Sequence, residues 1–219
     1  MATKKTTISK DKIVSLYMAY TLDHSDKPKS VYAFAKENNF TEAEFYNFFG
    51  TLESIEKEIF KMFLDKTVEL LHKDPNYPEY DMKSKMLSFY FTFFELLTAN
   101  RSYVSLSLQT HKSHLKNLAQ LSSLRTAFLD FVSQIIPDEV RIKQEKFQKM
   151  QEKALQESSW IQLLMTMKFW MEDDSPAFEK TDIYIEKSVK LSFELMNLAP
   201  IESLIDFGKF MFKEKIQNK

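Results

Sequence analysis

The chain has 219 residues, of which 44% are hydrophobic and 28% are charged, a composition typical of one or two globular domains. Its 30 basic and 31 acidic residues nearly cancel, which excludes the strong overall positive charge of proteins that bind nucleic acid mainly through charge. The absence of cysteine excludes disulfides, thiolate metal sites and cysteine nucleophiles, and the two glycines and six prolines indicate helices joined by few breaks. We therefore predict an all-α fold and a cytoplasmic protein.

The N-terminal part of the chain predicts three short helices. Ser9 and Ser30 are candidate N-caps for the first two helices, and Thr41 for the third. Glu44 stands at the third helical position after Thr41, as in a capping box. The three predicted helices span residues 10–22, 31–38 and 42–49. Packed together they form a compact unit, so we predict a first domain over residues 1–51.

A larger helical domain is predicted over residues 52–219. Its first helix, over 52–72, follows the small domain without a flexible linker and is expected to join the two domains. Prolines and short polar segments divide the remainder. Further helices are predicted over residues 80–99, 103–111, 115–136, 140–171, 178–198 and 201–216.

Two segments of this domain are rich in aromatic and methionine side chains. Residues 86–97 carry apolar side chains around nearly the whole helix, which predicts a helix buried on all sides. Residues 160–171 carry a second cluster. Bulky flexible side chains around a cavity suit a large apolar ligand, here a fatty-acyl, isoprenoid or aromatic compound, although ordinary core packing is the alternative. The candidate ligand-binding residues are Phe89, Phe93, Trp160, Leu164, Met167 and Trp170.

Residues 30–55 have the outline of a helix-turn-helix, a short helix, a tight turn and a second short helix that ends in aromatics. The informative positions are Ser30-Val31, Phe34-Ala35, Asn39-Phe40-Thr41, Phe45-Tyr46-Asn47-Phe48-Phe49 and Leu52-Glu53-Ser54-Ile55. This pattern resembles the DNA-binding segment of TetR-family regulators. The order of three short helices, a long connector and a larger helical domain is also similar to that family.

The resemblance implies a ligand-responsive, DNA-binding transcriptional regulator, with no enzymatic activity and no cofactor. By position, the implied phosphate contacts are Ser30, Thr41 and Tyr46, and the implied major-groove contacts are Glu42, Glu44 and Asn47. Asn47 can read adenine and a glutamate can accept from cytosine. Lys36 is the only basic residue in 30–49, so we expect DNA binding to be weak and strongly salt-sensitive. The alternative is that these helices survive only as a packing module.

The same resemblance implies a homodimer that pairs the helices over 140–171 and 178–198. A second, shorter similarity connects residues 177–188 with the end of lipid-binding accessory proteins of ubiquinone biosynthesis, which share the fold but do not read DNA. The alternative function is therefore a lipid-binding or membrane-associated accessory protein with a degenerate helix-turn-helix. Residues 201–219 contain an apolar stripe that fits either a membrane surface or packing on the domain itself.

The chemistry of an enzyme or a metal site is not indicated. His111 and His114 lie three positions apart, but no nearby carboxylate completes a ligand set. The sequence has no Gly-rich phosphate loop, nucleophile elbow or HExxH motif. We predict neither metal nor catalytic residues.

Overall fold

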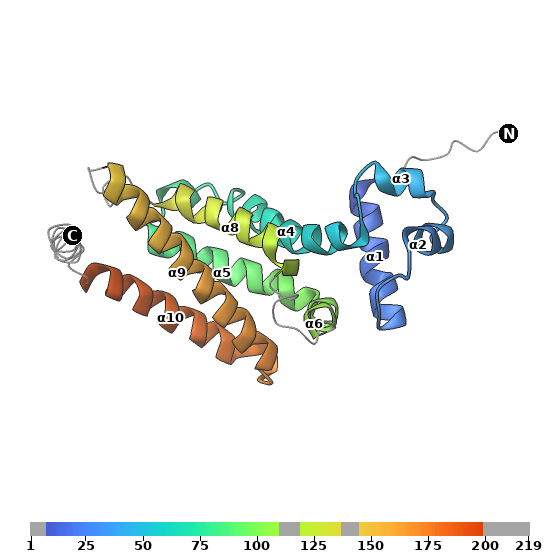
Figure 1. Cartoon of the computed structure of the whole chain (residues 1–219). Coiled ribbons are helices and arrows are strands. Elements are labelled where there is room, and N and C mark those ends of the chain that lie inside the picture. The colour runs from blue at the N-terminus through green and yellow to red at the C-terminus, as the bar shows by residue number, and fades with distance from the viewer. Residues whose placement is uncertain (1–7, 110–118, 137–144, 199–219) are drawn as a thin grey trace, which may run out of the picture. The chain divides into compact units, whose positions relative to one another are not determined.

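A computed structural model describes residues 8–109, 119–136 and 145–198 (Figure 1). Every regular element within these ranges is a helix, which confirms the predicted all-α fold. The α-helices are α1 (Lys10–His24), α2 (Val31–Glu37), α3 (Glu42–Tyr46), α4 (Leu52–Leu71), α5 (Met82–Ala99), α6 (Arg101–Gln109), α8 (Ser122–Ile135), α9 (Glu145–Glu172) and α10 (Glu179–Leu198), with two 3-10 turns, η1 (Tyr77–Glu79) and η3 (Pro176–Phe178). The predicted helix over 201–216 lies outside the described residues.

The described residues form two compact units. The first unit contains α1 to α4, the end of α5, α6 and the start of α8, over residues 8–74, 92–109 and 119–128. The second contains η1, the start of α5, the end of α8, α9 and α10, over residues 75–91, 129–136 and 145–198. Helices α5 and α8 thus contribute residues to both units. The predicted domain boundary after residue 51 stays a prediction.

The first three helices and their turns form the head (residues 8–51; Figure 1). They pack around one aromatic cluster. The ring of Phe34 is fully buried and lies 5.8 Å from Tyr17, 5.3 Å from Phe40 and 6.4 Å from Phe45 between ring centres. All three pairs meet edge to face, the arrangement that the charge distribution of aromatic rings favours. Burying one such side chain contributes about 1.5–3 kcal/mol, so the cluster stabilises the head without a large core.

Helix α4 follows the head and buries one apolar face within the first unit. Ile55, Ile59 and Phe60 on this face are buried, and so is the carboxylate residue Glu56. Helix α6 packs against α1 in the same unit. The predicted break between α5 and α6 is a single residue, Asn100, whose side-chain amide donates to the Leu96 carbonyl at 2.9 Å.

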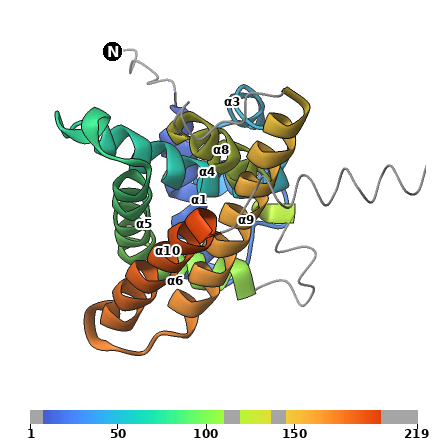
Figure 2. The ribbon, with the colours of Figure 1, turned by 90° about the vertical axis from the view of Figure 1, so that its left-hand side faces the viewer.

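In the second unit α9 and α10 run side by side (Figures 1 and 2). Both helices carry buried apolar side chains, Trp160, Leu163, Met167 and Trp170 on α9 and Ile185 and Val189 on α10. The side chain of Gln162 joins the helices further, because its amide donates to the Ser188 hydroxyl at 3.3 Å and its carbonyl accepts from the Ser192 hydroxyl at 2.9 Å. These bonds fix the register of the pair.

Helix α5 was expected to be buried on all sides over residues 86–97. The structure buries a wide face of it, made of Met86, Phe89, Tyr90, Phe93, Phe94 and Leu97. Leu87, Phe91 and Leu96 are only half-buried, and Glu95 is exposed. The expectation of all-round burial is therefore correct for the buried face and wrong for the rest of the helix, because hydrophobicity alone does not say which faces have a packing partner.

Candidate nucleic-acid interface and apolar cluster

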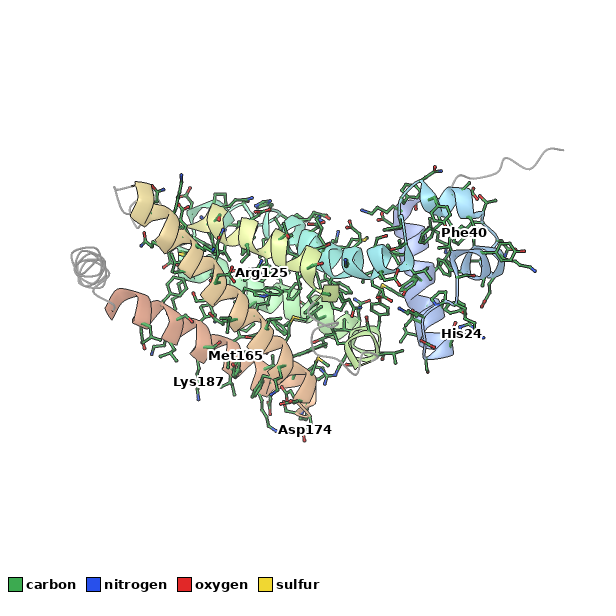
Figure 3. The ribbon with its side chains drawn as sticks, viewed as in Figure 1. His24, Phe40, Arg125, Met165, Asp174 and Lys187 are labelled. Carbon is green, nitrogen blue, oxygen red and sulfur yellow. The ribbon has the colours of Figure 1, made fainter. Side chains whose placement is uncertain are left out.

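The turn between α2 and α3 has the geometry of a helix-turn-helix. Asn39 adopts a left-handed conformation with φ 59°, which asparagine tolerates better than most side chains. The Phe40 amide donates to the Ala35 carbonyl at 3.0 Å and the Asn39 amide to the Lys36 carbonyl at 3.4 Å, the two bonds of a Schellman motif. The ring of Phe40, labelled in Figure 3, then packs on Phe34. These contacts end α2 and direct the chain into α3.

Hydrogen bonds from capping side chains fix the start of each of these two helices. The Ser30 hydroxyl accepts from the Ala33 amide at 3.1 Å. The Thr41 hydroxyl accepts from the Glu44 amide at 3.2 Å, and Glu44 Oε2 accepts from the Thr41 amide at 2.8 Å and from its hydroxyl at 2.8 Å. This confirms the predicted caps and capping box. Recruiting Glu44 to a base would break a cap worth about 1 kcal/mol.

Four of the candidate DNA contacts are exposed, Ser30, Thr41, Tyr46 and Asn47, and the last two lie together at the end of α3. Tyr46 is 54% exposed, whereas Glu42 and Glu44 are half-buried. The helix ends at Tyr46, earlier than predicted, because the amides of Phe48 and Phe49 both donate to the Phe45 carbonyl at 3.0 Å and tighten the last turn. The structure thus brings Tyr46 and Asn47 together on the surface and leaves Ser30, Thr41 and Glu44 in capping roles.

Two lysines of the head are held by carboxylates, Lys10 by Glu58 at 2.5 Å and Lys27 by Glu53 at 3.8 Å. The His24 imidazole lies 3.6 Å from the Glu37 carboxylate. A hydrogen bond from its own backbone amide and the charge of Lys27 lower the pKa of Glu53. Lys12, Lys29 and Lys36 are exposed and have no acidic partner among the described residues. Three of the five lysines within residues 8–51 are therefore available for phosphate, and the weak DNA binding expected from the sequence stays a prediction.

The predicted ligand-binding residues are distributed over both units. Phe93 belongs to the first unit, and the other five to the second. Those on α9 share one face, where Trp160, Met167 and Trp170 are buried and Leu164 is half-buried. The ring of Trp170 lies 6.3 Å from that of Phe178, and Phe89 stacks on Phe131 at 4.7 Å. Both contacts also occur in an ordinary core, so the ligand-binding role stays a prediction.

Sequence reasoning did not select the polar residues buried in the first unit. The Tyr17 hydroxyl of α1 donates to Glu56 Oε1 of α4 at 2.7 Å. Burial and the Glu56 carboxylate raise the pKa of Tyr17 far above its usual value, so the hydroxyl stays a neutral donor. One signal for Glu56 was present in the sequence, since it shares a helix face with Ile59 and Phe60.

The part of the chain that the structure describes contains neither a metal-binding cluster nor a membrane-spanning helix. No group of three or more His, Asp or Glu side chains in residues 8–109, 119–136 and 145–198 is arranged to hold a metal ion. None of the helices in these same ranges is long and apolar enough to cross a membrane.

One family model matches the C-terminal part of the chain. The family described as tetracyclin repressor-like, C-terminal domain, matches residues 85–211, which is more than half of the chain. A search of curated proteins found no match. The matched segment contains most of α5 and all of α6, α8, α9 and α10, and the helix-turn-helix precedes it. The chain belongs to the family of tetracycline repressor-like regulators.

Proposed function

We propose that the chain is a homodimeric, cytoplasmic transcriptional regulator that binds DNA through a reading domain over residues 1–51 and responds to a small apolar ligand held by residues 52–219. It acts without a cofactor and without catalysis. The observation that carries this proposal is the Schellman turn between α2 and α3, which leaves Tyr46 and Asn47 exposed together.

Asn47 is the residue that fits base reading best. Its exposed amide can donate to and accept from adenine in the major groove, and Tyr46 next to it can donate to a phosphate. Lys29 precedes α2 and is free of acidic partners among the described residues, so it can neutralise a phosphate. The affinity then rests on few charges, and the sequence selectivity rests on few side chains.

Fluorescence anisotropy tests the DNA site on the duplex upstream of the protein's own gene and on an unrelated duplex, at about 50–300 mM salt. Asn47→Ala is expected to reduce discrimination between the two duplexes about 5- to 100-fold, the worth of one bidentate base contact. Lys29→Ala is expected to weaken both complexes equally and to lower the salt slope by about 1. Lys73→Ala removes the same charge beyond the end of α4 and is expected to change neither.

A wild-type protein that binds neither duplex, with or without a bound ligand, contradicts the DNA-binding role. That outcome favours the alternative function, a lipid-binding or membrane-associated accessory protein. Flotation with liposomes then tests the membrane role of residues 201–219, which lie outside the described residues.

The homodimer is proposed from a row of exposed apolar side chains on α9 and α10. Ile161 and Met165 of α9 are each 56% exposed, and Ile183, Leu191 and Leu195 of α10 are 50%, 55% and 57% exposed. Each of these side chains is already about half buried, so covering the rest of it is worth about 1 kcal/mol. A second copy related by two-fold symmetry can cover these side chains with the same set of its own. Figure 3 labels Met165 on this face of α9.

Light scattering after size-exclusion chromatography tests this face. Leu191→Glu places a charge in the proposed contact and is expected to convert the dimer into a monomer. Leu22→Glu introduces the same charge at an apolar side chain of α1 that is 41% exposed, and is expected to leave the dimer intact. A monomeric wild type, or a Leu191→Glu protein that remains dimeric, contradicts the proposal.

The ligand site is tested with the chain's own tryptophans. The sequence contains two, Trp160 and Trp170, and both belong to the proposed site. Titration with cis-parinaric acid, a fluorescent fatty acid, is expected to quench their emission by energy transfer with a saturable curve. Leu164→Ala enlarges the site beside them and is expected to change the affinity, whereas an unsaturable or absent signal contradicts a fatty-acyl ligand.

A further inference from the structure

One buried side-chain amide of the first unit has an unused acceptor. Gln120, which comes just before α8, is only 4% exposed. Its nitrogen Nε2 donates to the Ser107 hydroxyl of α6. Its oxygen Oε1 is buried as well and accepts no hydrogen bond from any described residue. Since an amide oxygen has two lone pairs, the whole acceptor capacity of Gln120 remains available.

The elements that carry this amide are otherwise mostly apolar. Residues three and four positions apart form one face of α6, and the same kind of side chain follows Gln120. The buried residues of these two segments include Tyr103, Val104, Ser107, Leu108, Leu121 and Leu124. A hydrogen bond joins the hydroxyls of Tyr103 and Ser107. Apolar surroundings with a few polar groups are typical of small-molecule sites.

A buried amide oxygen without a donor destabilises the folded protein, because the oxygen has lost its bonds to water. Most buried polar groups in proteins therefore have a partner. Exchanging the two ends of the Gln120 amide would only move the deficit to Nε2, because the Ser107 hydroxyl faces one end alone. A bound molecule that donates a hydrogen bond to Oε1 removes this cost.

We propose that Gln120 Oε1 accepts a hydrogen bond from the ligand, which is therefore an apolar molecule with a neutral O–H or N–H donor, such as a long-chain alcohol, a phenol or an amide. The inference rests on the proposed response to a small apolar ligand and adds the polar group that this ligand carries. Phe93, one of the predicted ligand-binding residues, belongs to the same unit as Gln120. Ser107 is a positioning residue, since it holds Nε2 and leaves Oε1 for the ligand.

This acceptor separates classes of apolar molecules. An ether or a hydrocarbon leaves Oε1 without a donor, so the cost of the buried oxygen remains. An ionised carboxylate has no proton to donate and repels the partial negative charge of Oε1. A site that hydrogen-bonds its ligand discriminates strongly against an analogue that lacks the bonding group.

Isothermal titration calorimetry of the full-length protein tests the proposal with three probes. They are 1-octanol, its isomer heptyl methyl ether, whose oxygen accepts but does not donate, and octanoate at about pH 8, where the acid is ionised. The wild type is expected to bind 1-octanol about 5- to 100-fold more tightly than the ether, the worth of satisfying one buried polar group. Octanoate is expected to bind more weakly than 1-octanol.

Three variants locate the source of this preference. Gln120→Met keeps the length of the side chain without the amide, and is expected to bind the alcohol and the ether within about twofold of each other. Ser107→Ala releases Nε2 and is expected to reduce the preference without abolishing binding of the alcohol. Gln134→Met, at an exposed glutamine of α8, is the matched control and is expected to keep the wild-type ratio.

The inference is overturned if the wild type does not bind 1-octanol or binds the ether equally well, or if Gln120→Met keeps the preference. If Gln120→Met does not fold, the wild-type ratio and Ser107→Ala still decide. DNA anisotropy separates this inference from the regulatory function. A wild type that binds neither duplex contradicts that function while the alcohol-to-ether ratio still judges Gln120. A wild type that binds DNA selectively and takes up cis-parinaric acid, but does not prefer the alcohol, contradicts the role of Gln120 alone.

Discussion

The head and the α9–α10 pair differ in the kind of apolar side chain that they leave exposed. In the head, aromatic rings meet edge to face around the buried Phe34, and the most exposed apolar residues are Tyr32 and Tyr46, whose hydroxyls can bond water. In the pair, the exposed apolar side chains are aliphatic, and Met165 and Leu191 are each more than half exposed. The apolar surface of the pair therefore gains more free energy from being covered than the surface of the head does.

The polar contacts of the two regions also differ in range. The head is fastened mainly by caps between residues three positions apart, such as Thr41 and Glu44. The pair is fastened by bonds between helices, such as those of Gln162 to Ser188 and Ser192. Removing a capping side chain in the head should therefore affect only the helix that it caps. Removing a side chain that bonds α9 to α10 should weaken the packing of the two helices.

The largest effect is expected from Phe34→Ala in the head. Removing a fully buried ring from the centre of the cluster costs about 3–5 kcal/mol of unfolding free energy, measured by urea denaturation. Tyr32→Ala, at the exposed neighbour in α2, is expected to stay within about 0.5 kcal/mol. Hydrogen exchange should show the loss of protection in α1 to α3 and none in α9 and α10. An equal loss of protection in both regions would show that the aromatic cluster does not stabilise the head separately from α9 and α10.

The next effect is expected at the turn between α9 and α10. Both oxygens of the buried Asp173 accept hydrogen bonds, from the amide and hydroxyl of Ser175 at 2.9 and 2.6 Å and from those of Thr181 at 2.9 and 2.7 Å. These bonds hold a turn in which Ala177 and Phe178 have positive φ of 53° and 60°, at a cost of roughly 1–2 kcal/mol each. Asp173→Ala is expected to lower stability by about 2–3 kcal/mol in urea denaturation.

Asp174 provides the control for this change, since it stands next in the chain, is labelled at the turn in Figure 3 and has a side chain that is 90% exposed. Asp174→Ala loses only a surface contact with Lys180 and is expected to change stability by less than about 0.5 kcal/mol. Similar losses for both variants mean that the buried hydrogen bonds do not hold the turn.

The stability due to Asp173 should depend on pH with a defined sign. Burial alone raises the pKa of Asp173, but the hydrogen bonds from Ser175 and Thr181 outweigh it and lower the pKa well below its usual value. The unfolded group titrates near pH 3.9, so the contribution is complete above about pH 5 and is lost as the pH falls toward the folded pKa. The stability difference between wild type and Asp173→Asn is expected to be constant from about pH 7 to 5 and to shrink below about pH 4. A difference that grows on acidification contradicts this assignment.

The contrast between local and long-range contacts also explains how far the sequence was informative. The caps at Ser9, Ser30 and Thr41 were predictable because their partners lie three residues away. The Tyr17–Glu56 bond was not, since it joins residues 39 positions apart and depends on how α1 packs against α4. Helical periodicity shows an apolar face but not whether a neighbour covers it.

In the candidate sites, too, local features were predictable from the sequence and long-range contacts were not. The position of Tyr46 in a helix after a turn was predictable from the local pattern, whereas Asn47, predicted within that helix, lies just beyond its end. That Glu44 and Thr41 bond each other was also predicted, but not that nearby cations are held by carboxylates of α4, such as Lys27 by Glu53. Which of the aromatic residues on α5 and α9 line a ligand site depends on packing that neither spacing nor hydrophobicity records.

The smallest effect is expected from Glu53→Gln, which tests whether an ion pair between the head and α4 limits affinity for DNA. Glu53 holds Lys27 at 3.8 Å, and both side chains are partly exposed. Removing the carboxylate frees Lys27 for a phosphate, so affinity for any duplex should rise about twofold at low salt. The gain should vanish at about 300 mM salt, because exposed charges are screened there. Glu69→Gln changes the net charge equally near the end of α4, where Glu69 pairs with Lys66 and Lys73, and should have no such effect. Equal gains for both variants mean that overall charge, not the release of Lys27, sets the affinity.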